Sequence, residues 1–304
     1  MLDSPVVSRT GDPVTYGAYR GLLRARRDLH VHAKVVASTL YPADPLRPFN
    51  YLARQHYDLV IAWPPVFLPI EEAARRFPHV KFVALDASRR QVHTRAPNLE
   101  GAVFHAEEAA YLAGYLAARM ADRGPRPHVV SSIGGFPLPS VQALIAGFRA
   151  GAKRADPKIK LLNSYTRDFL SQAKCAHAAL GQIARGSRVV FDVAGDCGLG
   201  ALKVAKRKGV YGVGVDTDQS YLGKFILTSV VKNLGAAVYD LTKRLVDGRP
   251  RTGGNLNFGL RNHGVLLGKF SPEVPRGLRR QLIPLAAQIE RGTIVVPTTL
   301  HRAP

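Results

Sequence analysis

The sequence is poor in cysteine and in acidic residues, and it has no long apolar run. Its 304 residues include two cysteines, Cys175 and Cys197, which are too few for a disulfide scaffold and wrongly spaced for a zinc site. No window reaches the roughly 18 apolar residues of a membrane-spanning helix. Residues 1–21 also lack the apolar stretch of a secretory signal. The chain as given therefore carries neither a membrane span nor a targeting signal.

Motifs of common enzyme classes are absent as well. The sequence contains no G-x-S-x-G, no H-E-x-x-H and no G-x-x-x-x-G-K-[ST]. Its ten histidines are dispersed, and His30 and His32 flank an expected strand instead of forming a helical pair of metal ligands. We therefore expect no catalytic residue, no metal and no cofactor, and an enzyme is the less favoured class.

Basic residues far outnumber acidic ones. Against 43 Lys and Arg stand 22 Asp and Glu, which gives a formal net charge of +21. This balance favours anionic surroundings, such as nucleic acid, acidic lipid headgroups or a cell wall. The densest basic clusters, at 24–27 and 203–208, come without zinc-finger spacing or an RNP-like aromatic strand. A solvated basic surface is therefore favoured over a nucleic-acid site.

Short apolar runs alternate with amphipathic segments along most of the chain, which is the pattern of parallel sheets covered by helices. A first series predicts helices at 16–27, 49–55 and 70–77, and strands at 31–37, 58–62 and 80–85. A second series predicts helices at 106–122, 141–155, 171–185 and 199–208, and strands at 129–133, 159–163, 189–194 and 211–215. The two series indicate an α/β protein with two doubly wound lobes.

The last part of the chain does not simply extend the second series. It predicts a strand at 226–231, a helix at 234–246, hairpin-like short strands at 256–260 and 264–267, and a helix at 278–291. We expect residues 1–105 and 226–255 to form the first lobe, and residues 106–225 and 256–304 to form the second.

Chemistry-bearing residues follow the predicted strands. Ligands of open parallel sheets bind beyond the carboxyl ends of the strands. Glycines, carboxylates and aromatics occur there, in the segments Trp63-Pro64-Pro65, Asp86-Ala87-Ser88, Gly134-Gly135-Phe136-Pro137, Asp168-Phe169, 195–200 and Asp216-Thr217-Asp218-Gln219. Carboxylates accept hydrogen bonds from vicinal hydroxyls, and aromatic side chains stack on ring-shaped ligands. Their joint placement favours a site for a small polar ligand.

Each of these features also has a plainer interpretation. Gly195-x-x-Gly198-x-Gly200 resembles a dinucleotide loop, but its spacing departs from G-x-G-x-x-G. Phe136 and Phe169 are equally consistent with core positions at the lobe edge. Asp86 and Asp216 are equally consistent with caps of helices or turns.

Several ordered motifs resemble the basic membrane protein family, the substrate-binding lipoproteins of ABC transporters that include purine nucleoside receptors. Residues 193–200 resemble its AGGTGLG segment, residues 212–222 its GVDSDQ segment, and residues 227–233 its LTS-x-x-K segment. The stretches at 111–117 and 146–152 are also similar. The likeness runs in order from Tyr19 to Pro297.

The resemblance implies a type I periplasmic-binding fold, in which the chain crosses three times between lobes and the ligand lies in the cleft. By their match to the motifs, Asp216 and Lys232 contact the ribose of a nucleoside. The same match implies that Phe169 stacks on the base and that Asp86 contacts the base, and Gly195 is expected to let the backbone approach the ligand.

The opening of the chain departs from the family pattern. The family begins with a strand and a loop resembling D-x-S-F-N, whereas here the first strand is missing and Val14 falls where the aromatic belongs, with Tyr16 as its substitute. Trp63-Pro64-Pro65 replaces a more glycine-like stretch. We expect that an upstream signal peptide, a lipobox cysteine and the first strand precede Met1 in the gene, so that the protein is extracytoplasmic and membrane-anchored. In-frame stop codons just upstream would contradict this.

The two cysteines gain a place in this fold. Cys175 lies in the first turns of a predicted helix and Cys197 just after the next strand, so both lie at the carboxyl edge of the second sheet, and a disulfide there would brace the loop beside Gly195. Free thiols are the alternative.

The sequence thus predicts a monomeric binding protein that closes by a hinge around a nucleoside and then docks on an ABC permease. One alternative is a ligand-sensing regulatory protein on the same fold. Another is a nucleoside-processing enzyme that uses Asp216 or Asp86 as an acid or base.

Overall fold

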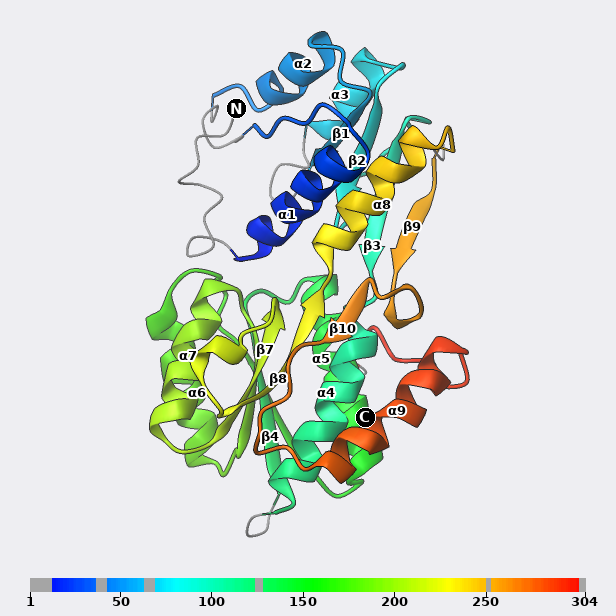
Figure 1. Ribbon diagram of the computed structural model, residues 1–304. Coiled ribbons are helices and arrows are strands. Elements are labelled where there is room, and N and C mark those ends of the chain that lie inside the picture. Colours follow the sequence, from blue (N-terminus) through cyan, green and yellow to red (C-terminus); the bar gives the residue numbers. More distant parts are fainter. Residues whose placement is uncertain (1–12, 37–42, 63–68, 124–127, 250–252, 301–304) are drawn as a thin grey trace. The chain divides into compact units, whose positions relative to one another are not determined.

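The chain folds into two compact α/β units. The computed structural model describes residues 13–36, 43–62, 69–123, 128–249 and 253–300 (Figure 1). Unit 1 comprises Met1–Phe104 and Asn233–Phe258, and unit 2 comprises His105–Lys232 and Gly259–Pro304. The chain therefore passes from one unit to the other after Phe104, after Lys232 and after Phe258. These crossings and the parallel sheets described below confirm the expected fold class.

Unit 2 is built on a six-stranded sheet in the order β10-β8-β7-β6-β4-β5. Five of its strands are parallel, and β10 is antiparallel to β8 at one edge. The strands are β4 (Val129–Gly134), β5 (Lys160–Tyr165), β6 (Val189–Val193), β7 (Tyr211–Asp216), β8 (Ile226–Lys232) and β10 (Val265–Leu267). The near-continuous burial of β4 and β6 is expected of central strands covered by helices on both faces.

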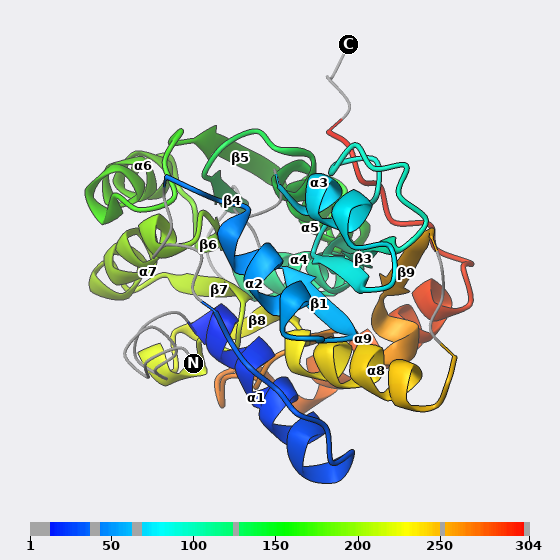
Figure 2. The same ribbon diagram turned by 90° about the horizontal axis from the view of Figure 1, so that it is seen from above.

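Helices cover both faces of this sheet (Figures 1 and 2). One face carries α4 (Ala106–Ala121) and α5 (Pro139–Ala155), and the other carries α6 (Gln172–Ala184) and α7 (Asp196–Arg207). Successive side chains of β6 point to opposite faces of the sheet. Phe191 stacks on Phe148 of α5, whereas Val190 belongs to the apolar cluster with α6 and α7. The last helix, α9 (Arg276–Glu290), packs on α4.

Glycines allow α4 and α5 to pack unusually closely. A Cβ at Gly114 would collide with the backbone of Phe148, and one at Gly151 with the backbone of Tyr111. Both glycines lie in stretches that resemble family motifs. Part of that resemblance is therefore explained by the packing of the two helices and not by ligand contact.

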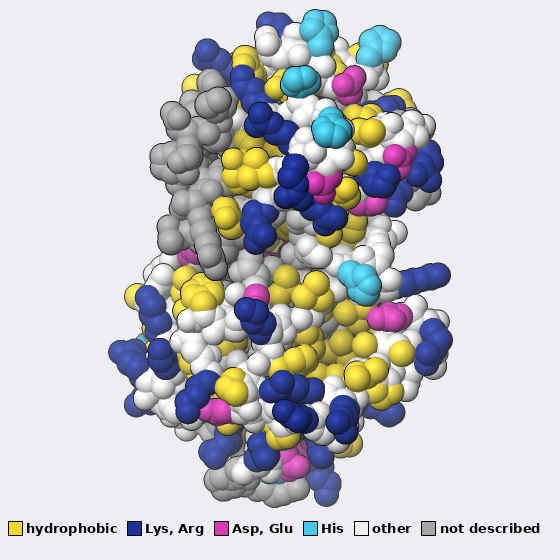
Figure 3. Space-filling model, viewed as in Figure 1, with side chains coloured by type: hydrophobic (Ala, Val, Ile, Leu, Met, Phe, Trp, Pro, Cys, Tyr) yellow, Lys and Arg dark blue, Asp and Glu magenta, His cyan; other side chains and the backbone are white. Residues whose placement is uncertain are grey.

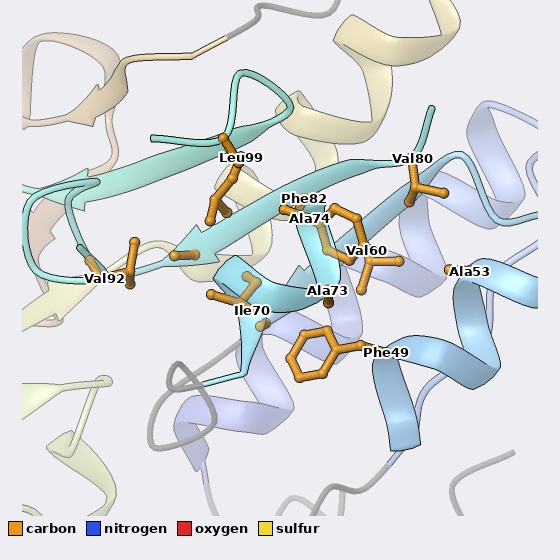
Figure 4. Packing of buried hydrophobic residues seen from close by; sticks show 14 residues of the cluster. Phe49, Ala53, Val60, Ile70, Ala73, Ala74, Val80, Phe82, Val92 and Leu99 are labelled. Atoms are coloured by element: carbon orange, nitrogen blue, oxygen red, sulfur yellow. The ribbon is translucent and has the colours of Figure 1, made fainter. Parts of the chain in front are cut away.

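Unit 1 contains a four-stranded parallel sheet in the order β1-β2-β3-β9. Its strands are β1 (Leu59–Ala62), β2 (Lys81–Leu85), β3 (Leu99–Phe104) and β9 (Asn255–Phe258), and its helices are α1 (Pro13–Asp28), α2 (Arg47–Arg54), α3 (Ile70–Arg76) and α8 (Leu234–Val246). Figure 4 shows Phe49 from α2 and Ile70 from α3 packed around Val60 and Phe82 of the strands. Leu241 and Leu245 of α8 line a small cavity of about 20 Å³ with side chains of the same sheet.

The structure differs from the predicted elements at three places. The predicted strand at 31–37 is irregular backbone over the described residues 31–36, where no neighbouring strand pairs with it. β3 was missed, because Glu100 and Gly101 interrupt its apolar run. The hairpin-like pair near the end is no hairpin: β9 joins the sheet of unit 1 beside β3, whereas β10 joins the sheet of unit 2 beside β8.

The division into lobes also differs at two strands, because β9, at Asn255–Phe258, belongs to unit 1 although the sequence assigned residues from 256 onward to the second lobe. The sequence assigned 226–255 to the first lobe, but β8 lies between β7 and β10 in the sheet of unit 2. The chain enters unit 1 only after Lys232, since β8 first completes its ladder with β7. The Trp63-Pro64-Pro65 segment and Val14 lie outside the residues or side chains that the structure describes.

Basic side chains are dispersed over the face of the molecule seen in Figure 3, with apolar and uncharged groups between them. This dispersal agrees with a solvated basic surface. No described helix is both long and apolar enough to span a lipid bilayer.

Candidate functional site

The carboxyl edge of the six-stranded sheet gathers the predicted site residues of unit 2. Because β4 to β8 run parallel, the segments that follow them emerge at one edge. Phe136 follows β4, Phe169 follows β5 and Gly195 follows β6, while Asp216 ends β7 and Lys232 ends β8. The strand order thus brings residues from separate parts of the sequence to one edge of the sheet.

Asp216 and Lys232 form an ion pair at the ends of neighbouring strands. The Lys232 Nζ lies 3.2 Å from Asp216 Oδ1, and their side chains are 9% and 26% exposed, respectively. Asp216 is registered opposite Val231, so Lys232 follows its cross-strand neighbour directly. Asp216 Oδ1 is buried and, apart from the ion pair with Lys232, has no partner among the residues that the structure describes. The pair places a carboxylate and an ammonium group together at this edge, and their contact with a polar ligand stays a prediction.

Two residues at the same edge have a positive φ. Asp216 has φ 63°, a left-handed conformation that non-glycine residues adopt rarely, and Gly195 has φ 56° at the start of α7. Such conformations persist where the surrounding structure enforces them, and they cluster at functional sites. Gly195 is the N-cap of α7 and Asp216 ends β7, and contact of either residue with a ligand stays a prediction.

Two phenylalanines form an aromatic pair at this edge. The ring centroids of Phe136 and Phe169 are 5.3 Å apart, with an angle of 50° between their planes. Phe169 lies over the backbone of Gly135, where a Cβ would collide with its ring. Phe136 is 39% exposed, which excludes a core role for its ring within unit 2. The pair offers aromatic surface to a ring-bearing ligand.

The loop that carries Phe169 is anchored on both sides. The Asp168 carboxylate accepts hydrogen bonds from the backbone N–H groups of Leu170 and Ser171 and from Lys174 Nζ, at 2.8 to 2.9 Å. The Lys174 contact is the largest of the effects that hold the pKa of Asp168 below its usual range. Cys175 and Cys197 form a disulfide, with Cα atoms 5.5 Å apart. Of the two alternatives left open by the sequence, the structure contains the bond.

An unpredicted carboxyl lies beneath the site. Asp192 of β6 is fully buried; its Oδ1 accepts a hydrogen bond from Ala194 N at 2.9 Å, and its Oδ2 has no partner among the described residues. Burial raises the pKa of Asp192 to about 8, with smaller contributions from the charges of Asp216 and Asp196. The carboxyl is therefore mostly protonated at neutral pH. The sequence feature that could have pointed to Asp192 is its position as the single acidic residue inside the apolar run Val189–Val193.

Asp86 and Tyr16 belong to unit 1. Asp86 directly follows β2 with φ 64°, so it repeats the backbone geometry of Asp216 at the end of another parallel strand. Tyr16 lies in the first turns of α1. Their share in a ligand site stays a prediction.

The described residues contain no group of three or more His, Cys, Asp and Glu side chains arranged to hold a metal ion. The edge instead combines an acceptor–donor pair, close backbone approach and aromatic surface. This chemistry suits recognition of a hydroxylated, ring-bearing molecule.

Comparison with protein families gives one match that spans nearly the whole chain. A model of the family described as Bmp, ABC transporter substrate-binding protein PnrA-like, matches residues 6–299.

The matches to curated relatives are shorter than the match to the family model. The chain is 32% identical over 204 residues to basic membrane protein A of Borreliella afzelii, covering 66% of this chain and 62% of that protein. It is 32% identical over 214 residues to the ABC transporter nucleoside-binding protein BmpA of Lactococcus lactis subsp. cremoris, covering 64% and 59%, respectively. The matched region thus spans less than two thirds of these relatives.

Solved structures share the fold. A solute-binding protein of an ABC transporter system from Conexibacter woesei superposes with a TM-score of 0.76 at 24% identity, covering 94% of each chain. At this identity the likeness concerns the fold alone.

Proposed function

Since the chain belongs to the Bmp family of PnrA-like ABC transporter substrate-binding proteins, we propose that it is an extracytoplasmic binding protein that captures a nucleoside and delivers it to an ABC permease. The name of the Lactococcus relative, a nucleoside-binding protein, supports the ligand class. Binding, and not turnover, is the proposed activity.

One observation carries the proposal, namely that the ion pair of Asp216 and Lys232 and the aromatic pair of Phe136 and Phe169 follow strands that end at the same sheet edge. A nucleoside combines vicinal hydroxyls with a flat base. In the proposed complex the ribose hydroxyls bond to Asp216 and Lys232, and the base stacks on Phe169.

The remaining predicted contacts follow from the family resemblance. Gly195 admits the ligand close to the backbone at the start of α7, because it carries no side chain and glycine readily adopts its φ of 56°. Asp86 contacts the base and Tyr16 supplies a second aromatic face. Binding is accompanied by hinged closure, which presents the loaded form to the permease.

The disulfide supports the proposed compartment. Structural disulfides persist in oxidising compartments and are rare in the cytosol, and Cys175–Cys197 is fully buried in the apolar cluster of α6 and α7. Anchoring by an N-terminal lipid belongs to the same proposal. Fractionation of the native organism tests it: we expect the protein in the membrane fraction, released by detergent, and recovery with the cytoplasm would contradict it.

A thermal-shift panel tests the ligand class. The panel contains guanosine, inosine, adenosine, uridine, the free bases and ribose. A ligand that binds only the native state stabilises it by about 2.7 kcal/mol at a hundredfold excess over Kd, so we expect a shift with one or more nucleosides. A cooperatively unfolding chain that responds to none of them contradicts nucleoside capture, and release of free base from a nucleoside would indicate an enzyme instead.

A further inference from the structure

The disulfide joins the starts of the two helices that flank the aromatic loop. Cys175 lies in the first turn of α6 and Cys197 in the first turn of α7, and 22 positions separate them in the sequence. α6 follows the loop that carries Phe169, and α7 follows Gly195. The bond thus links the two segments that border the ring of Phe169.

Phe169 itself is held from the α7 side. Its carbonyl oxygen accepts a hydrogen bond from Cys197 N at 2.9 Å, and the same oxygen would lie 3.3 Å from a Cβ on Gly195. The residue before it, Asp168, is held from the α6 side by Leu170, Ser171 and Lys174. Phe169 therefore lies between an anchor on α6 and an anchor on α7, and the disulfide fixes the spacing of these anchors.

The two helices have further contacts that do not depend on sulfur. A Cβ at Gly200 of α7 would collide with the backbone of Gln172 of α6, and Lys203 Nζ donates to Gln172 Oε1 at 2.8 Å. Buried Ala179 and Ala201 belong to the same apolar cluster. Unit 2 is therefore expected to stay folded without the bond.

From these contacts we propose that the Cys175–Cys197 disulfide is a positioning element of the ligand site, which holds Phe169 in the orientation that receives an aromatic ring. This proposal rests on the proposed function. An ordered ring avoids the entropic cost of ordering it when the ligand binds, so the bond increases affinity without touching the ligand. Reduction by a dithiol transfers two electrons and two protons to the cystine, giving two thiols and an oxidised reductant, and it releases the constraint.

A double-mutant cycle with inosine as the probe measures this coupling. We compare wild type, Cys175→Ala/Cys197→Ala, Phe169→Ala and the triple variant by calorimetry, well below the unfolding temperature of each. Removing the disulfide should weaken inosine binding about tenfold when Phe169 is present and less than about twofold when it is absent. An equal loss in both backgrounds overturns the proposal, since the bond would then act on the fold as a whole.

Hydrogen exchange provides a readout that needs no ligand. In the Cys175→Ala/Cys197→Ala variant the amides of Leu170, Ser171 and position 197 should exchange faster, while those of α4 keep their wild-type rates. Unchanged exchange at these amides overturns the positioning role even if inosine binds. Absence of inosine binding by the wild type, together with faster local exchange, would instead count against the nucleoside assignment alone.

Two further results bear on the bond itself. Mass spectrometry of the unreduced wild type should show both cysteines oxidised, and two free thiols would overturn the proposal. Cys175→Ser/Cys197→Ser should behave as the alanine pair does, because neither can form the bond.

Discussion

The ammonium of Lys232 lies 3.2 Å from the carboxylate of Asp216, although the two residues come from different strands. Their proximity follows from the parallel pairing of β7 and β8, which brings both strand ends to one edge. The same edge carries Phe169, Gly195 and Phe136, and each of these residues can be substituted separately.

Asp216→Ala should weaken nucleoside binding. The substitution removes a hydrogen bond to a charged group, worth about 1.5–3 kcal/mol, and it removes the ion pair with Lys232. We expect Kd to rise about 10- to 150-fold, measured by calorimetry. Asp240→Ala is the matched control, because Asp240 pairs with Arg244 on the surface of α8. Equal Kd values for wild type and Asp216→Ala would remove this residue from the site.

Asp192→Asn should change how stability depends on pH. The pKa of Asp192 is raised to about 8 in the native state, compared with about 4 in the unfolded chain. Between these values the native state keeps a proton that the unfolded state has lost. The wild type therefore loses stability as pH rises from about 4 to about 8, by up to about 1.4 kcal/mol per pH unit.

The Asn variant cannot ionise, so its free energy of unfolding should change less with pH across this window. Above pH 8 it should exceed that of the wild type, as measured by urea titration at each pH. Asp168→Asn is the control. The pKa of Asp168 is lowered, chiefly by Lys174, so its contribution is lost only as pH falls through the acid range. Parallel profiles for wild type and Asp192→Asn between pH 5 and 9 would show that Asp192 is ionised in the native state.

Gly198→Ala should destabilise unit 2. Gly198 lies in the first turn of α7, where a Cβ would overlap the buried Asp192 carboxyl. Overpacking of this kind costs about 3 kcal/mol. Gly181→Ala in α6 is the matched control, since a Cβ there meets no atom within 4 Å, and it should stabilise the helix by about 0.5–1 kcal/mol. A Gly198→Ala protein with the wild-type unfolding temperature would contradict the packing described for α7.

Loss of the disulfide should lower overall stability as well as affinity. In the chain-entropy description, a bond that closes a loop of this length, with a separation of 22, contributes about 3 kcal/mol. Cys175→Ala/Cys197→Ala should unfold at correspondingly lower urea concentration, with a larger m-value because the unlinked unfolded chain exposes more surface. A midpoint equal to that of the wild type would mean that the bond is not formed in the protein.

Much of the site in unit 2 could be predicted from the sequence, because strand ends in a parallel sheet share one edge whatever the details of packing. That rule alone brought Asp216, Gly195 and Phe169 together. Lys232 and its role came from the family resemblance, and the structure then placed it beside Asp216. Asp192 escaped notice because its surroundings depend on Gly198, a contact between strand and helix that periodicity does not encode.

The errors in the fold have similar causes. β3 contains Glu100 and Gly101, which are poor strand formers, and it is stabilised by pairing with β2 on one side and β9 on the other. The segment 31–36 has a strand-like composition but no neighbouring strand among the described residues. Pairing across distant parts of the chain decided both cases.

The most direct test of the account is calorimetric titration of the wild-type chain with inosine, and separately with hypoxanthine and ribose. The account predicts saturable binding of the nucleoside at one site, and binding of the base and the sugar that is weaker by at least about tenfold each, since each engages only part of the edge. No heat with inosine from folded protein, or equal affinity for ribose alone, would contradict nucleoside capture by the edge that Asp216, Lys232 and Phe169 form.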